Sequence, residues 1–322
     1  MKKIVYIGVN GRIGRNFLPM FVNISPADED IELVLITSKS KNSFNKISGL
    51  IKEIKGLLIV KHKDIKIIIT DDYSNIKNAD IIICSANVTP TQEQMDYFKQ
   101  IDNTGRMVQS LVNKEIILKI ADYVNLYSPK SIFLLITNQV DTLCQLVRKK
   151  FNNLNVIGVG GYIDSVRLRQ IFFDKYKLKT DSLMLGYHNN SMFPLMDSIP
   201  VDLQNNELLN IIQLVKDYGM IISTEQGYGS SILPASALVD FVNAYLFNHE
   251  LINSFNVKIT NENVAKYYGV DINTSLSIPI KVTYKKIDYL TNYKLNDKEK
   301  QNIQESINNL EKDIKIIDNY IN

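Results

Sequence analysis

The chain has 322 residues, of which 45% are hydrophobic and 22% are charged. These values are ordinary for a globular protein with one large or two medium domains. A formal net charge of +3 is too small to indicate nucleic acid or a membrane surface as the main partner. No apolar run approaches the roughly 20 residues that cross a bilayer. The two cysteines, Cys84 and Cys144, have neither metal-ligand nor disulfide spacing, so we expect a cytoplasmic protein.

The first half of the chain alternates short apolar runs with helical patterns. Strands are expected at residues 4–7, 32–36, 65–70, 80–84 and 131–137, and helices at 13–22 and 140–151. Apolar strands that alternate with helices predict a parallel sheet covered on both faces. Because crossovers between parallel strands are right-handed, the sheet should be doubly wound.

The second half is less regular. Helices are expected at residues 163–176, 207–218 and 231–247, and a final amphipathic helix at 296–317. Extended stretches near residue 257 and at 278–282 indicate an antiparallel sheet. The fold class is therefore α/β. A dinucleotide-binding domain is expected over residues 1–150, and an α+β catalytic domain over residues 151–322.

Three glycines follow the first predicted strand and open the first predicted helix. Gly8, Gly11 and Gly14 form a G-x-x-G-x-x-G pattern, which is typical of dinucleotide binding in this context. One glycine allows a tight turn, another lets the backbone approach a pyrophosphate, and the last lets helix and strand pack closely. The alternative is a plain structural turn. The residues predicted here to bind the cofactor are Gly8, Gly11, Arg12, Ile13 and Gly14.

The end of the second predicted strand bears on the choice of coenzyme. Sites for NAD usually carry an Asp or Glu there, which binds the ribose hydroxyls. In this chain the strand ends in Thr37 and Ser38, followed by Lys39. Hydroxyls and a lysine can instead hold a 2′-phosphate. The cofactor is therefore NAD or NADP, with NADP favoured, and these three residues join the expected cofactor site. The alternative is a solvated loop with no role in selectivity.

Three later segments occur in an order that is typical of one family. They are ITNQVDTL (136–143), VIGVGGYIDSVRLR (156–169) and LGYHNNSMFP (185–194). The chain resembles the lactate/malate dehydrogenase family in these segments and in the C-terminal stretches GVDINTSLSIPIKV and LNDKEKQNIQESINNL, so the resemblance covers nearly the whole chain. It implies a Rossmann domain followed by a substrate domain. It also implies an oxidoreductase that transfers hydride between a nicotinamide and C2 of a 2-oxo or 2-hydroxy acid. No metal is implied, and a homodimer or homotetramer is expected.

The resemblance implies roles for individual residues. His188 matches the proton donor and acceptor, and Asp164 matches the carboxylate that orients its imidazole. Arg167 matches the arginine that binds the substrate carboxylate. Arg106 matches a loop arginine that polarises the carbonyl, and Asn138 matches an asparagine that contacts substrate and cofactor. Further expected contacts are Ser230 and Ser231 with substrate, and Ser85 and Ala86 with cofactor. Arg169 is expected on a solvated helix face.

Several positions depart from the family pattern. The loop over residues 87–106 is longer than usual by about ten residues, and the family's substrate-discriminating residue lies in this loop. Gln139 replaces a usual proline, and Tyr187 and Asn190 flank His188 in place of Glu and Asp. The segment 219–237 is longer than usual before the next helix. We therefore expect a lactate-like or bulkier substrate rather than simply pyruvate or oxaloacetate, although a harmless insertion would give the same long loop.

A protein of a different class remains an alternative. A dinucleotide-binding sensor or scaffold without turnover would explain the altered loop and the altered second strand. A binding module needs neither a proton donor nor a carboxylate clamp, however, so the presence of His188, Asp164, Arg167 and Arg106 together favours the enzyme.

Overall fold

The computed structural model describes residues 1–99, 106–189, 191–200 and 204–319. The chain divides into two compact units. Unit 1 comprises residues 1–157, 231–249 and 283–285, and unit 2 comprises residues 158–230, 250–282 and 286–322. The boundary predicted near residue 150 lies at the end of helix α5 (Val140–Lys150), before unit 2 begins.

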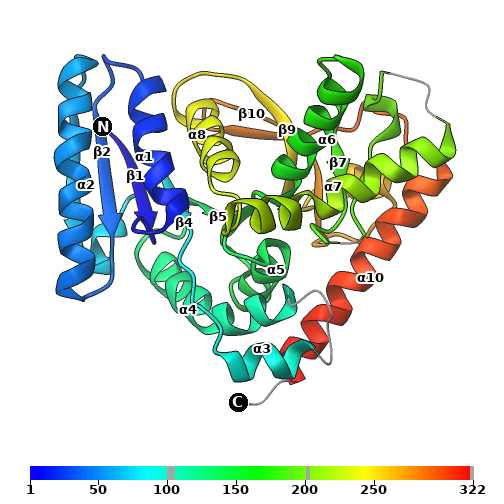
Figure 1. Cartoon of the computed structure of the whole chain (residues 1–322), viewed down its shortest axis with the longest axis horizontal. Helices are drawn as coiled ribbons and strands as arrows, with labels where there is room; N and C mark the ends of the chain where they lie inside the picture. The colour runs from blue at the N-terminus through cyan, green and yellow to red at the C-terminus, as the bar shows by residue number, and fades with distance from the viewer. Residues whose placement is uncertain (100–105, 190, 201–203, 320–322) are drawn as a thin grey trace. The chain divides into compact units, whose positions relative to one another are not determined.

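The strands β1 to β6 of unit 1 lie side by side (Figure 1). In sheet order β3-β2-β1-β4-β5-β6, the parallel pairs are β1 with β2, β2 with β3, β1 with β4 and β4 with β5. This order, in which the chain winds outward in both directions from β1, confirms the predicted doubly wound sheet. The strands are β1 (Lys2–Ile7), β2 (Ile31–Ile36), β3 (Ile65–Thr70), β4 (Ile81–Cys84), β5 (Ile132–Leu135) and β6 (Asn155–Gly158).

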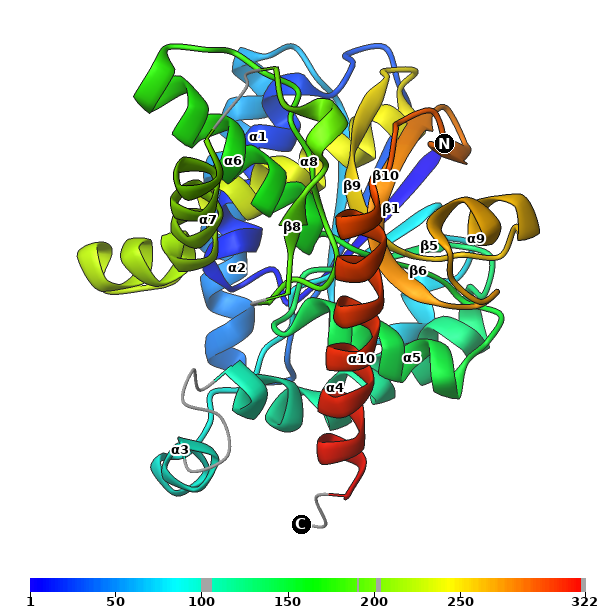
Figure 2. The same cartoon turned by 90° about the vertical axis from the view of Figure 1, so that its right-hand side faces the viewer.

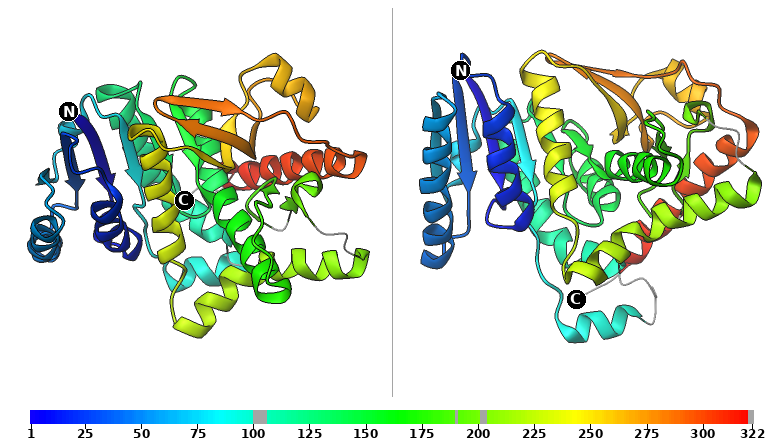
Figure 3. Two further views of the ribbon diagram at one scale, coloured as in Figure 1. Left: turned by 90° about the horizontal axis from the view of Figure 1, so that it is seen from above. Right: turned by 45° about the horizontal axis from the view of Figure 1, so that its top comes forward.

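Helices cover the sheet of unit 1. Helices α1 (Arg12–Ile24), α2 (Lys41–Val60) and α8 (Ile232–Leu246) lie on the same side of the strands (Figure 3). Right-handed crossovers in the opposite winding direction place α4 (Arg106–Tyr127) and α5 on the other side. The short helix α3 (Gln92–Lys99) and the 3₁₀ turn η1 (Tyr73–Ile76) complete the unit. The long loop expected over residues 87–106 thus contains a helix, and its residues 100–105 lie outside the described residues.

Unit 2 joins long helices to an antiparallel sheet. Strand β9 (Leu251–Lys258) pairs with β10 (Ser275–Thr283), with Phe255 opposite Ile278, which confirms the antiparallel sheet. Its helices are α6 (Gly160–Tyr176), α7 (Asn205–Gln226), α9 (Glu262–Tyr268) and α10 (Asp297–Asn319). Short elements are β7 (Met184–Leu185), β8 (Phe193–Pro194), η2 (Met196–Ser198) and β11 (Lys286–Tyr289).

The predicted end of α7 was wrong. The helix was expected to stop at Tyr218, but it continues to Gln226 and ends where Gly227 adopts a left-handed φ of +77°. The apolar residues Met220 to Ile222 extend the helical pattern past Gly219. The segment 219–237 is therefore not a long connection, because its first part is the last two turns of α7.

The two cysteines are free and fully buried in unit 1. Burial raises the pKa of both thiols to about 12. They should therefore remain protonated and unreactive at neutral pH. No helix in the described part of the chain is long and apolar enough to cross a membrane.

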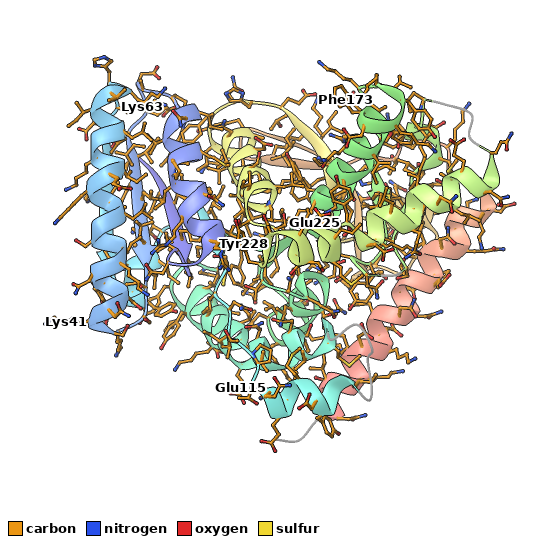
Figure 4. All side chains as sticks on the ribbon, viewed as in Figure 1. Lys41, Lys63, Glu115, Phe173, Glu225 and Tyr228 are labelled. Carbon is orange, nitrogen blue, oxygen red and sulfur yellow. The ribbon has the colours of Figure 1, made fainter. Side chains whose placement is uncertain are left out.

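Lys63 lies between the ends of α1 and α2 (Figure 4). Its ammonium donates hydrogen bonds to the main-chain oxygens of Val22 (2.6 Å), Asn23 (3.1 Å) and Ser25. The last carbonyls of a helix have no hydrogen-bond donor within the helix, and this end carries a partial negative charge. The Lys63 ammonium donates to these carbonyls, and its positive charge offsets the negative one. Lys63→Met is therefore expected to lower the free energy of unfolding by about 1–2 kcal/mol, as measured by urea denaturation. Lys61→Met, at an exposed neighbour, is the matched control; an equal loss there would contradict the capping role.

Candidate active site

The glycine turn of unit 1 is shaped for close approach of the backbone. Gly8 has φ +87°, and a Cβ built on it would lie 2.6 Å from the nitrogen of Ala86. A Cβ on Gly14 would lie 2.4 Å from the oxygen of Val9. Side chains cannot be accommodated at either position, so the start of α1 presents main-chain N–H groups at an open turn. Such a turn fits a pyrophosphate.

A cavity of about 850 Å³ opens at the carboxyl ends of the unit 1 strands. This volume suits a ligand the size of a dinucleotide. Among its lining residues are seven of the predicted cofactor residues: Gly8, Gly11, Thr37, Ser38, Lys39, Ser85 and Ala86. The predicted Arg12, Ile13, Gly14 and Asn138 do not line it. The rings of Tyr73 and Tyr123 stack in its wall, with centroids 4.4 Å apart; the sequence analysis did not find them.

The rim of this cleft after β2 is fixed by hydroxyl groups. Asn10 donates from Nδ2 to Thr37 Oγ1 at 2.7 Å. Ser38 and Ser40 both donate to Ser43 Oγ, at 2.7 and 2.9 Å, and Ser40 also caps the N-terminus of α2. These bonds hold the rim to the first turn of α2. The predicted polar loop is therefore an ordered, hydroxyl-rich surface.

Two carboxylates follow β3 in the same cleft. Asp72 caps η1, because its carboxylate accepts hydrogen bonds from the nitrogen and the hydroxyl of Ser74 at 2.8 and 2.7 Å. The half-buried side chain of Asp71 makes no hydrogen bond or ion pair with the described residues. The nitrogen of Thr37 donates to the oxygen of Thr70 at 3.0 Å, so Asp71 follows directly beside the end of β2. Asp71 was not predicted as a site residue, because the sequence alone does not reveal that β3 pairs with β2.

Asn138 follows β5, and its side chain is exposed. The Asn138–Gln139 peptide bond is cis. Buried Asn113 donates to the Asn138 oxygen at 3.3 Å and accepts from the nitrogen of Val88 at 2.7 Å. Asn113 thus ties the loops that follow β4 and β5 to each other. Arg106 begins α4, and its side chain lies outside the described residues.

Unit 2 brings together three of the predicted catalytic residues. Asp164 and Arg167 lie on α6, three residues apart, so they share a face of the helix. His188 follows β7, and its Nδ1 lies 2.5 Å from Asp164 Oδ2. Arg167 Nη1 lies 3.6 Å from Asp164 Oδ1. One carboxylate therefore contacts the imidazole with one oxygen and faces the guanidinium with the other.

The burial of His188, Asp164 and Arg167 favours the binding of an anion beside them. The side chain of Asp164 is 2% exposed and that of Arg167 is 8% exposed, whereas His188 keeps 20%. Buried charges are costly unless they are paired. When His188 is protonated, two positive charges face one negative charge. The cluster then has a net charge of about +1, which a bound carboxylate anion would neutralise.

Helix α7 packs closely on the arginine. A Cβ built on Gly219 would lie 3.2 Å from Nη2 of Arg167, so the bare backbone of α7 covers the guanidinium. Gly219 was not predicted as a site residue. The prediction that Arg169 lies on a solvated helix face was wrong. Arg169 Nε donates to the oxygen of Ser182 at 2.9 Å, and burial lowers the pKa of its guanidinium.

The two serines predicted to contact substrate belong to different units. Ser231 is buried in unit 1, where its Oγ accepts a hydrogen bond from Asn16 Nδ2 at 3.1 Å. Ser230 is half-buried and ends the α7 part of unit 2. Ser231 therefore already has a structural partner.

Family models match both parts of the chain. The lactate/malate dehydrogenase NAD binding domain matches residues 2–158, and the alpha/beta C-terminal domain of the same family matches residues 163–320. Among curated relatives, the malate dehydrogenase of Methanosphaera stadtmanae is 21% identical over 310 residues, covering 93% of this chain and 92% of the relative. The L-2-hydroxycarboxylate dehydrogenase (NAD(P)(+)) of Methanocaldococcus jannaschii is 26% identical, covering 87% and 88%.

Solved structures share the fold. A lactate dehydrogenase of Trichomonas vaginalis in complex with NADH and oxamate has a TM-score of 0.83 at 18% identity, over 99% of this chain and 98% of that one. A malate dehydrogenase of Plasmodium falciparum has a TM-score of 0.80 at 22% identity, over 98% of both chains. The family models of both domains match in the expected order and over nearly the whole length of the chain. The chain therefore belongs to the lactate/malate dehydrogenase family of NAD-binding oxidoreductases.

Proposed function

We propose that the protein transfers hydride between a nicotinamide coenzyme and C2 of a lactate-like or bulkier 2-oxo or 2-hydroxy acid. The observation that carries this proposal is the arrangement of His188, Asp164 and Arg167, in which a partly exposed imidazole is held beside a buried carboxylate and a buried guanidinium. A proton donor next to a carboxylate-binding group is what reduction of a 2-oxo acid requires.

Each residue of the group has a distinct proposed role. Asp164 holds Nδ1–H of His188, which fixes the tautomer and the orientation of the imidazole. Nε2 of His188 then gives a proton to the 2-oxo oxygen during reduction and takes it back during oxidation. Arg167 binds the substrate carboxylate as a planar fork. Arg106 and Asn138 are proposed to polarise the carbonyl, and Ser230 and Ser231 to contact the rest of the substrate.

The coenzyme supplies the hydride when it is bound. The cradle at Gly8 and Gly14, which has no room for a Cβ, fits its pyrophosphate. We assign Gly8, Gly11, Arg12, Ile13 and Gly14 to the phosphates; Thr37, Ser38 and Lys39 to the adenosine ribose; and Ser85, Ala86 and Asn138 to the nicotinamide half.

Lys39 and Asp71, which have opposite charges, are proposed to set the preference between NADP and NAD. Ser38 and Lys39 on the rim after β2 favour a 2′-phosphate and hence NADP, whereas the Asp71 carboxylate in the same cleft favours the ribose diol of NAD. Lys39→Ala is expected to lower kcat/KM for NADPH about 10-fold with little change for NADH. Asp71→Asn should raise kcat/KM for NADPH instead. Equal effects on both coenzymes, measured at fixed ionic strength, would remove these residues from coenzyme selection.

The reaction is tested with purified protein, NADH or NADPH, and 2-oxo acids graded by size and charge. Loss of absorbance by the reduced nicotinamide is expected with at least one acid. Coenzyme binding seen by fluorescence without oxidation across the series would contradict the proposal and favour a non-catalytic sensor or scaffold.

We further propose that the enzyme is a cytoplasmic homodimer or homotetramer. The family resemblance and two adjacent exposed apolar residues at the end of α2, Ile59 (76%) and Val60 (71%), support self-association. Light scattering on the purified protein gives the molar mass that decides this, and a monomer mass would refute it.

A further inference from the structure

Helix α10 is bonded to the segment that carries His188 by three polar side chains. Glu299 Oε1 accepts a hydrogen bond from the nitrogen of Met196 at 2.9 Å. Ser306 Oγ donates to the oxygen of Ser191 at 2.9 Å. Asp313 Oδ2 accepts from the hydroxyl of Tyr187 at 2.6 Å. All of these residues belong to unit 2, and Figure 2 shows α10 running lengthwise beside β8.

The spacing of these three residues is regular. Glu299, Ser306 and Asp313 stand seven residues apart, which is close to two helical turns, so they form one stripe along α10. A second stripe of Ile303, Leu310 and Ile317 is buried beside it. The apolar stripe provides the packing, and the polar stripe fixes the position of α10 along the His188 segment. A shift of one turn would break all three bonds at once.

The bonds reach the immediate neighbours of His188. Tyr187 is 1% exposed, and its hydroxyl donates a hydrogen bond to Asp313, which fixes the position of the ring. Gly186 has φ +95°, and a Cβ on it would lie 2.6 Å from Ser306 Oγ, so the chain presses directly on α10 there. The residues preceding His188 are thus anchored on one side by α10, while its imidazole is held by Asp164 at 2.5 Å.

We propose that Tyr187 and Asp313 are positioning residues that set the orientation of His188 through α10. This inference rests on the proposed function of His188 as proton donor. Tyrosine stands at position 187 where the family pattern has glutamate. The hydrogen bond between Tyr187 and Asp313 therefore depends on a residue at which this chain departs from that pattern. Tyr187 precedes His188 directly in the chain, so the hydrogen bond from Tyr187 to Asp313 acts on His188 through the backbone that carries the imidazole.

The test uses the whole chain with two single variants and the double variant that combines them. Tyr187→Phe removes only the hydroxyl, and Asp313→Ala removes its acceptor. Both are expected to lower kcat about 10- to 100-fold, because small misplacements of a reacting group have effects of this size. KM for the 2-oxo acid and the Kd for NADH should change little. The double variant should be no worse than either single one, since both break the same bond.

Two controls separate positioning from general stability. Asp313→Asn keeps an oxygen that accepts from Tyr187 and should restore most of kcat. Glu311→Ala changes an exposed residue two positions away on α10 and should leave kcat unchanged. If kcat per folded molecule is unchanged in Tyr187→Phe and Asp313→Ala, or if their effects add, the proposal is overturned.

A readout that does not need activity completes the experiment. The chain has only three histidines, so the imidazole signal of His188 in an NMR spectrum is identified by its loss in His188→Asn. Tyr187→Phe is expected to shift or broaden this signal and to leave those of His62 and His249 in place. If the wild type reduces no 2-oxo acid but Tyr187→Phe shifts the His188 signal, the proposed function fails and the positioning role of Tyr187 is supported. If the wild type is active but Tyr187→Phe changes neither the His188 signal nor kcat, only the proposed positioning role fails.

Discussion

Replacing His188 by asparagine is expected to lower kcat by about 10²- to 10⁴-fold, the usual contribution of a positioned acid–base group. Asparagine keeps a hydrogen bond to Asp164 within reach but cannot carry the proton to the 2-oxo oxygen. The cleft proposed to hold the coenzyme is lined by residues of unit 1, so the Kd for NADH should not change. Steady-state kinetics and NADH fluorescence measure the two effects separately.

His62→Asn is the matched control for this prediction. His62 is exposed and has φ +51°, a conformation that asparagine tolerates better than most residues. The same substitution there should leave both kcat and stability unchanged. A variant at His188 that keeps more than about a tenth of wild-type kcat would show that another group delivers the proton.

The doubly wound sheet could be predicted from the sequence because its signals are local. Strand Ile65–Thr70 is rich in isoleucine, which favours extended structure, and its predicted bounds agree with the structure. The glycine turn identified the cleft for a similar reason, since the steric demands at Gly8 and Gly14 permit little else. Helix α2 was not predicted, because the residues between its buried isoleucines Ile47, Ile51 and Ile54 include serine, glycine and charged side chains, which are also common in loops.

Contacts distant in sequence could not be predicted in this way. Asp71 shares a cleft with Thr37 only because β3 pairs with β2, which one strand end alone does not reveal. Gly219 lies on the guanidinium of Arg167 through the packing of α7, and nothing in its flanking residues indicates that contact. Helix α10 was predicted as an amphipathic helix, but the segment to which its polar residues bond was not. The group of His188, Asp164 and Arg167 was predicted from family resemblance, and local spacing could link only Asp164 with Arg167.

Arg167→Lys is expected to lower kcat/KM for the 2-oxo acid by about 10²- to 10³-fold, corresponding to the loss of a buried, charge-assisted pair. Lysine keeps the positive charge but not the planar fork that binds a carboxylate with two parallel bonds. The loss should appear mainly as a higher KM, because the bond to the carboxylate is made before the reaction and persists through it. Arg169→Lys, two residues along α6, serves as the control and should leave KM near the wild-type value.

Gly219→Ala tests the same site from the opposite helix. A Cβ 3.2 Å from Nη2 of Arg167 must push the guanidinium aside by a few tenths of an ångström, so KM should rise about 3- to 10-fold. Alanine is more favourable than glycine inside a helix by up to about 1 kcal/mol, so the thermal stability should hold or increase. A higher KM in an equally or more stable protein cannot come from misfolding. It would show that the bare backbone of α7 at this point is there to leave the arginine in place. An unchanged KM would mean that the guanidinium has room to move without losing its hold on the substrate.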